Sequence, residues 1–235
     1  MKPTLERIDG IDVVRDDLFP GGTKARFIAT LFEEAEELVY ASPAQGGAQY
    51  ALATVARRLG KKATIFVAKR RKPHPRTLEA RALGAQVYQV PCGYMTVVQA
   101  RARTYAEDTG ARLLPFGLDV PIAQDAIASA AASLGIEPEE VWCAAGSGVL
   151  ARALAKAWPA ARLHAVQVGR PLIPAEVAGG VIHIYPRRFE QTCRQFPPFP
   201  SDPHYDAKAW ELCRERAHGK RTLFWNVAGP ANVLA

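Results

Sequence analysis

Gly21-Gly22-Thr23-Lys24 and Ala144-Ala145-Gly146-Ser147-Gly148-Val149-Leu150 each place a glycine turn directly before a helical pattern. The first turn ends in a lysine, whose amine can condense with a carbonyl group. The second turn follows the apolar run 141–144 and precedes the helical pattern 150–158, so it joins a strand to a helix. A helix N-terminus presents free N–H groups and the positive end of the helix dipole, and it therefore holds a phosphate without a basic side chain.

Short apolar runs alternate with helical patterns along most of the chain. Strands are expected at 11–14, 38–41, 63–68, 86–90, 113–115, 140–144, 163–168 and 222–225, and helices at 25–37, 48–59, 75–83, 96–108, 120–134, 150–158 and 206–217. This alternation predicts an α/β fold with crossover units and parallel sheets. Ligands bind such sheets beyond the carboxyl ends of the strands, where both glycine turns fall. The segment 194–205 is rich in proline and aromatic residues, and it is expected to be an ordered loop.

A lysine amine and a phosphate-binding turn together suit pyridoxal 5′-phosphate, which carries an aldehyde and a phosphate. Lys24 is the predicted catalytic residue, because it can hold the cofactor as a Schiff base and then act as a general base. The turn supplies the predicted phosphate contacts, which are Gly146, Ser147, Gly148, Val149 and Leu150.

Arg15-Asp16-Asp17-Leu18-Phe19-Pro20-Gly21-Gly22-Thr23-Lys24-Ala25-Arg26 resembles the lysine motif of fold-type II pyridoxal-phosphate enzymes, the tryptophan synthase beta-like family. It is most similar to the aminocyclopropane-carboxylate deaminase and D-cysteine desulfhydrase branch, whose pattern is Arg-Asp-Asp-Leu, a short gap, then Gly-Gly-Asn-Lys-x-Arg. The resemblance extends to about residue 168. It implies two lobes, each an open, mostly parallel sheet flanked by helices. Residues 1–42 and 116–235 would form the large lobe, with the lysine and the phosphate turn, and 43–115 the small lobe.

The resemblance also implies further site residues. The family places a polar side chain near the pyridine nitrogen, close to its C-terminal strands, and this points to Asn226. Where the family often has Ser-Asn-His or Gly-Asn after its second strand, this chain has Gln45-Gly46-Gly47-Ala48. Gln45 is predicted to contact cofactor and substrate, and the N–H groups of Gly46 and Gly47 to bind a substrate carboxylate. Tyr205, at the end of the proline-rich loop, is a further predicted substrate contact.

The net charge of +7 is concentrated in one segment. Nine basic residues and no acidic one lie between Arg57 and Arg76, so the rest of the chain is slightly acidic. Such a run is either a solvated surface or a contact for DNA or a nucleotide. The predicted nucleic-acid contacts within it are Lys69, Arg70, Arg71 and Lys72.

The cysteines, the apolar runs and the length of the chain bear on metal sites, membrane spans, location and oligomeric state. The four cysteines, Cys92, Cys143, Cys193 and Cys213, stand far apart, so we expect buried, reduced thiols and no metal site. No run reaches the ~20 apolar residues of a membrane span, and residues 1–6 lack an apolar signal core, so a cytoplasmic protein is expected. The chain is shorter than is usual for the family, which favours a homodimer whose partner subunit closes the site.

These observations predict a lyase-type enzyme. It would form an external aldimine with a small amino-acid-type substrate and catalyse elimination, replacement, deamination or decarboxylation at Cα or Cβ. The substrate is either a free amino acid or an amino group on a modified thymine nucleotide in phage DNA, which the basic segment favours. The alternative is a catalytically eroded protein that still binds pyridoxal phosphate or a nucleotide, supported by the altered 45–48 loop.

Overall fold

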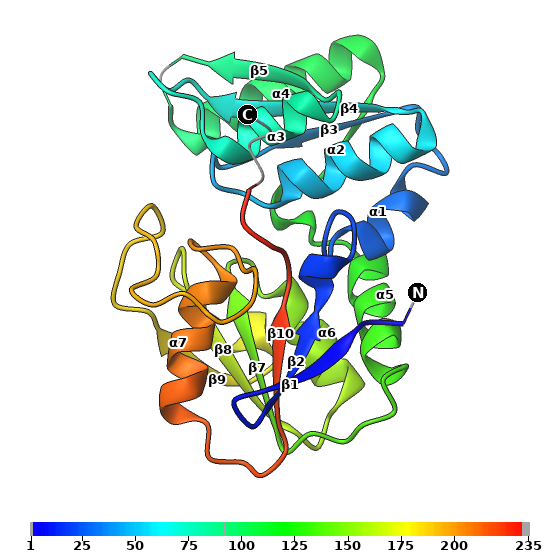
Figure 1. Ribbon diagram of the computed structural model, residues 1–235. Coiled ribbons are helices and arrows are strands. Elements are labelled where there is room, and N and C mark those ends of the chain that lie inside the picture. Colours follow the sequence, from blue (N-terminus) through cyan, green and yellow to red (C-terminus); the bar gives the residue numbers. More distant parts are fainter. Residues whose placement is uncertain (1, 92, 232–235) are drawn as a thin grey trace. The chain divides into compact units, whose positions relative to one another are not determined.

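The computed structural model describes residues 2–91 and 93–231, which divide into two compact units (Figure 1). The larger unit contains residues 2–26 and 119–230, and the smaller unit contains residues 27–118 together with residue 231. Residues 27–42, expected in the large lobe, pack with the smaller unit because their strand pairs there.

The larger unit is built on a six-stranded sheet in the order β1-β2-β10-β7-β8-β9. Its strands are β1 (Leu5–Ile8), β2 (Ile11–Arg15), β7 (Glu140–Ala145), β8 (Arg162–Gln167), β9 (Val181–Ile184) and β10 (Thr222–Asn226). All neighbours run parallel except β1, which is antiparallel to β2. Every residue of β7 and of β10 is buried, as expected of central strands covered on both faces.

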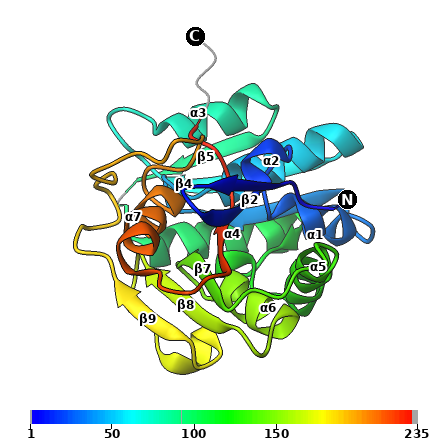
Figure 2. The same cartoon turned by 60° about the horizontal axis from the view of Figure 1, so that its bottom comes forward.

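Helices cover both faces of this sheet (Figure 2). Helix α7 (Asp206–Arg216) lies on one face, where its Trp210 and Cys213 join a core with Trp142 and Phe224. Helices α5 (Pro121–Ala132) and α6 (Val149–Ala157) pack together on the other face. Two short 3₁₀ helices, η1 (Asp16–Leu18) and η3 (Pro174–Val177), belong to the same unit.

The smaller unit is a four-stranded parallel sheet in the order β5-β4-β3-β6. Its elements are β3 (Glu37–Ala41), β4 (Lys62–Ala68), β5 (Gln86–Val90), β6 (Arg112–Leu113), α2 (Ala48–Leu59), α3 (Pro75–Ala82), α4 (Met95–Thr109) and η2 (Phe116–Leu118). Helix α4 packs its Val98 and Ala102 on Val39 and Phe66, while α2 and α3 pack on each other. Helix α1 (Ala25–Leu31) spans the division between the units.

The α/β architecture with open, mostly parallel sheets is confirmed, and the expected strands and helices are present, with two differences. The helix expected at 25–37 ends at Leu31, and the side chain of Lys61 donates to the backbone oxygens of Phe32 and Ala35 beyond its end. Strands β1 and β9 were not expected. Both are four-residue edge strands whose side chains are partly exposed. None of the described helices is long and apolar enough to cross a membrane.

Candidate active site

Lys24 ends the turn between η1 and α1. Gly21 and Gly22 in this turn have φ angles of 89° and 66°, which glycine adopts without strain. A Cβ on Gly22 would lie 2.4 Å from the backbone oxygen of Val227, so only glycine allows this close approach. The N–H of Thr23 donates to the same oxygen over 3.0 Å. The turn is therefore fixed on the chain that follows β10, and it places Lys24 at the start of α1.

A buried polar network surrounds the turn. The hydroxyl of Thr23 donates to Asp16 Oδ2 over 2.7 Å and accepts from the indole N–H of Trp225 over 2.9 Å. Arg26 Nε donates to the same carboxylate over 2.9 Å. Because Asp16 and Thr23 are almost fully buried, these bonds leave the residues on both sides of Lys24 little freedom.

Tyr205 connects the lysine turn to the glycine turn after β7. Lys24 Nζ lies 5.9 Å from the centroid of the Tyr205 ring. On its other side, the Tyr205 hydroxyl would be 3.1 Å from a Cβ placed on Gly146. Burial raises the pKa of Tyr205, and the charge of Asp206 adds to the shift, so the hydroxyl stays protonated at neutral pH. The structure thus brings three of the predicted site residues together within one unit.

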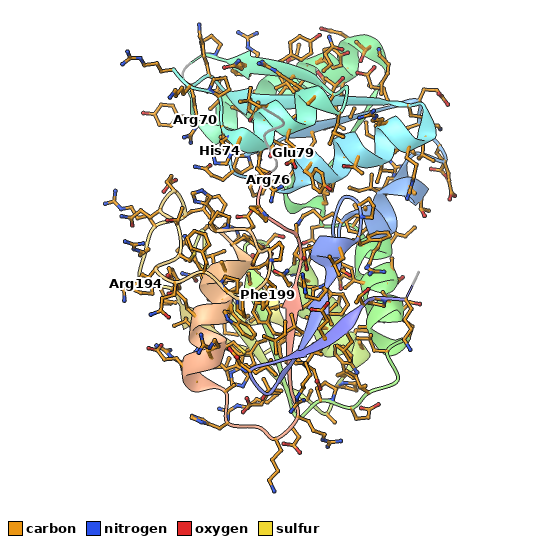
Figure 3. The ribbon with its side chains drawn as sticks, in the orientation of Figure 1. Arg70, His74, Arg76, Glu79, Arg194 and Phe199 are labelled. Carbon is orange, nitrogen blue, oxygen red and sulfur yellow. The ribbon has the colours of Figure 1, made fainter. Side chains whose placement is uncertain are left out.

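The segment 194–205 is an ordered loop, as expected, and its packing explains the position of Tyr205. Phe199 is buried, meets Trp210 edge-on at 4.9 Å between centroids and lies under the guanidinium of Arg15 (Figure 3). The N–H of Asp202 donates to the oxygen of Ala228 over 3.0 Å. These contacts hold the loop on the sheet just before Tyr205.

The glycine turn between β7 and α6 leaves the N-terminus of α6 open to an anion. Gly148 has a φ of 80°, and a Cβ there would lie only 1.9 Å from the backbone oxygen of Glu176. Arg152 supports the turn by donating to that oxygen over 2.9 Å and to Asp119 Oδ2 over 2.7 Å. No acidic side chain occupies the first turn of α6, so its N–H groups and dipole remain available.

Asp206, the first residue of α7, has a buried carboxyl group close to the backbone N–H groups of Val227 and Ala228. Its exposed fraction is 1 %, and neither carboxylate oxygen meets a donor with ordinary geometry among the described residues. Burial and the charge of Asp202 raise its pKa well above the ordinary value. The charge of Lys24 and the N–H groups of Val227 and Ala228 oppose this shift, so Asp206 lies within their electrostatic reach.

Comparison with known proteins identifies the family. A family model described as pyridoxal-phosphate dependent enzyme matches residues 7–193, which is most of the chain. This protein belongs to the pyridoxal-phosphate dependent enzyme family. Its cofactor is pyridoxal 5′-phosphate. No curated protein sequence matches the chain at a significant level.

Solved structures of fold-type II pyridoxal-phosphate enzymes share the fold. An aminocyclopropane-carboxylate (ACC) deaminase homologue superimposes with a TM-score of 0.82 at 17% identity, covering 97% of this chain and 90% of its own. Maize serine racemase gives 0.72 at 12% identity, with 100% and 89% covered. Diaminopropionate ammonia lyase from Escherichia coli gives 0.67 at 16% identity, with 97% and 83% covered. At these identities the likeness establishes the fold and leaves the reaction open.

The residues of the larger unit fit pyridoxal 5′-phosphate on three counts. Lys24 supplies an amine on a fixed turn, and the N-terminus of α6 offers N–H groups to a phosphate. Asp206 is a buried carboxyl group within electrostatic reach of Lys24, and such a group accepts a hydrogen bond from a protonated ring nitrogen.

Asn226 lies at the end of β10, as expected, and its amide group is largely committed to the protein. Its Nδ2 donates to Asp17 Oδ1 over 2.7 Å and to the oxygen of Pro200 over 2.9 Å. Both partners are acceptors, so the orientation of the amide is fixed by chemistry. Only the buried, unpaired Oδ1 remains, and Asn226 can accept a hydrogen bond from a cofactor but cannot donate one.

The loop Gln45-Gly46-Gly47 follows β3 in the smaller unit, at the N-terminus of α2. Gln45 is buried, and a Cβ on Gly46 would lie 2.6 Å from Ser42 Oγ. Gly47 meets no atom within 4 Å of a Cβ position, so the space beside it is open. Gln49 fixes the loop by donating to the backbone oxygens of residues 43 and 44. The contact of the Gln45-Gly46-Gly47 loop with cofactor or substrate remains a prediction.

The remaining predictions concern the four cysteines and a metal site. Cys143, Cys193 and Cys213 are free and buried, while Cys92 lies outside the described residues. In the part of the chain that the structure describes, no group of three or more His, Cys, Asp and Glu side chains could hold a metal ion.

Asp206 is the site residue that the sequence analysis missed. Its one local signal, a carboxylate directly after Tyr205, is also typical of an ordinary helix start.

Proposed function

We propose that this protein is a lyase-type enzyme that acts at Cα or Cβ of a small amino-acid-type substrate, by elimination, replacement, deamination or decarboxylation. The observation that carries the proposal is the position of Tyr205 between Lys24 Nζ and the glycine turn at Gly146. Covalent attachment and phosphate binding require these two motifs to lie together, although they are far apart in the sequence.

In this proposal Lys24 supplies the amine that attaches the cofactor, and the turn Gly146-Ser147-Gly148 with the first N–H groups of α6 binds its phosphate. When bound, pyridoxal 5′-phosphate supplies an aldehyde for the substrate amine and a ring that withdraws electrons from Cα. The network of Thr23, Asp16 and Trp225 holds Lys24 at the site, so its amine can act as the base that removes a proton from Cα.

Asp206 and Tyr205 supply the remaining chemistry. The carboxyl group of Asp206 is available to accept a hydrogen bond from a protonated ring nitrogen. The side-chain oxygen of Asn226 is a second acceptor for the same donor. The Tyr205 hydroxyl stays protonated and is therefore suited to donate a hydrogen bond to a leaving group. Burial of this pair excludes water and strengthens both interactions.

Substrate contacts are proposed for the Gln45-Gly46-Gly47 loop of the smaller unit and, separately, for Tyr205 of the larger unit. The open space beside Gly47 and the dipole at the N-terminus of α2 favour a carboxylate there. The N–H of Gly46 already donates to the oxygen of Pro43 over 2.9 Å, so the carboxylate contact is assigned to the N–H of Gly47. A cytoplasmic homodimer is part of the same proposal, and light scattering of the purified protein tests the dimer.

A second candidate substrate is an amino group carried by a modified thymine nucleotide in phage DNA. The observation that favours it is the exposed run Lys69–Lys72 in the smaller unit. Incubating the protein with free amino acids and with amine-bearing DNA, and following product release, separates the two candidates.

The proposed chemistry is tested by borohydride reduction of the cofactor-loaded protein followed by peptide mass measurement. Reduction should add a pyridoxyl group to the peptide that contains Lys24, and Lys24→Ala should abolish the addition. Lys156, an exposed lysine paired with Asp125, supplies the control variant Lys156→Ala, which should label normally. Labelling elsewhere would overturn the assignment of Lys24. Labelling at Lys24 without a spectral change on adding any amine would favour the eroded binding protein.

A further inference from the structure

The nine basic residues between Arg57 and Arg76 do not form one surface. Arg57 and Arg58 lie in the last turn of α2. Lys61 binds backbone oxygens and Glu36, and Lys62 lies 3.3 Å from Glu37 at the start of β4. Arg76 is buried on α3 and pairs with Glu79 over 2.9 Å (Figure 3). The basic run is therefore continuous in the sequence but divided in space.

Four of the nine charges remain together and exposed. Lys69, Arg70, Arg71 and Lys72 form the loop between β4 and α3, and all four side chains are exposed. None of them forms an ion pair with another described residue. Four adjacent like charges repel one another, and a bound polyanion would relieve that repulsion.

An exposed aromatic ring lies beside this loop. Tyr94 is 77% exposed, begins α4 and makes no capping hydrogen bond with its side chain. The loops that follow β4 and β5 are neighbours, because the N–H of Lys69 donates to the oxygen of Val90 over 2.8 Å. A Cβ on Gly93 would also lie 3.7 Å from the Cβ of Ala68. The four cations and the ring thus share the carboxyl edge of one sheet.

We propose that Lys69–Lys72 and Tyr94 form a binding surface for single-stranded nucleic acid. The four cations bind successive phosphates, and this interaction is independent of base sequence. The Tyr94 ring stacks on a base, as exposed aromatic side chains beside basic grooves do in single-strand binding proteins. A duplex keeps its bases stacked on one another, so the exposed ring favours a single strand. This inference goes beyond the proposed reaction and does not depend on it.

The test is binding of a fluorescent 20-nucleotide oligothymidylate, measured by anisotropy on the cofactor-loaded protein over a range of salt concentrations. With four phosphate contacts, the logarithm of the association constant should fall against the logarithm of salt concentration with a slope of about −3. Replacing Lys69, Arg70, Arg71 and Lys72 together by Gln should remove most of the affinity and flatten the slope. The matched control is Arg57→Gln with Arg58→Gln, which changes exposed charges at the end of α2 and should bind normally.

The contribution of the ring is tested separately. Tyr94→Ala should weaken binding by about 5- to 100-fold without changing the salt slope, and Tyr94→Phe should restore it. Thermal unfolding of each variant shows whether it is folded. No binding at low salt, or equal loss in the Arg57 and Arg58 control, would overturn the proposal. The proposal would also be overturned if duplex DNA or inorganic polyphosphate bound equally well and Tyr94→Ala had no effect. Pyridoxyl labelling of Lys24 is unaffected by any of these outcomes, so a failure here leaves the proposed function standing.

Discussion

The indole N–H of Trp225 donates a 2.9 Å hydrogen bond to the hydroxyl of Thr23, 202 residues earlier in the chain. The same hydroxyl donates to the buried carboxylate of Asp16. The lysine turn near the start of the chain is therefore fixed by the last strand of the sheet. The position of Lys24 depends on β10 as much as on its own glycine turn.

Thr23→Val should destabilise the protein by about 2–4 kcal/mol, because it leaves the buried Trp225 N–H without an acceptor and removes one donor from Asp16. It should also slow pyridoxyl labelling of Lys24. Urea unfolding and the labelling rate measure the two effects. Thr23→Ser keeps the hydroxyl and should retain most of both. Equal loss in the two variants would show that the methyl group, and not the hydroxyl, fixes the turn.

Gly148→Ala should cost at least about 3 kcal/mol and abolish cofactor binding, since the new Cβ would stand 1.9 Å from the backbone oxygen of Glu176. Gly135→Ala is the matched control. Gly135 also has a positive φ, of 68°, but a Cβ there meets no atom within 4 Å. It should cost only the ~1–2 kcal/mol of a left-handed conformation and leave cofactor binding intact. Urea unfolding and cofactor titration separate the steric effect from the conformational one.

The sequence predicted the parallel core because fully buried strands are continuous apolar runs, as at β7 and β10. The edge strands were missed for a different reason. Strand β1 is Leu-Glu-Arg-Ile, and β9 begins after Gly180 with side chains that stay partly exposed. Both are only four residues long, so the pattern of either is too short to mark a strand, although β9 is the largely apolar run Val-Ile-His-Ile.

The site was predictable only where its chemistry is local. A lysine after two glycines and a glycine turn before a helix are visible in the sequence. Asp206 is different, because an acidic residue in the first turn of a helix is ordinary. Only folding brings it, buried, within electrostatic reach of Lys24. Asn226 ends β10, while its bonds to Asp17 and Pro200 depend on loops distant in sequence, and its contact with the cofactor stays a prediction.

Asp206→Asn should stabilise the cofactor-free protein at pH 8 and lower the activity of the loaded enzyme at least tenfold. Burial raises the pKa of Asp206, so the folded state binds its proton more tightly than the unfolded state does. Stability from this group is present at low pH and is lost as the pH rises through the folded pKa. The free energy of unfolding of the variant, relative to that of the wild type, should therefore rise between pH 4 and pH 8. Urea unfolding at both values tests this, and a variant less stable at pH 8 would contradict it.

His164 should make the free energy of unfolding fall as the pH decreases from about 6.5 to about 4. Its ring stacks on Trp142 at 4.1 Å between centroids, and its Nδ1 lies 2.9 Å from His183 Nε2. Burial lowers the pKa of His164 to about 4, with Arg162 and His183 adding to the shift and Glu140 opposing it.

The sign follows from the depressed pKa. Between pH 4 and pH 6.5 the unfolded chain binds a proton at this histidine that the folded protein does not, so acid favours unfolding by up to about 3 kcal/mol. His164→Gln should flatten the dependence over this interval, while His218→Gln, at an exposed histidine, should leave it unchanged. Urea unfolding at half-unit steps of pH measures both. A wild-type slope in His164→Gln would assign the acid sensitivity to another group, such as the neighbouring His183, whose pKa burial also lowers.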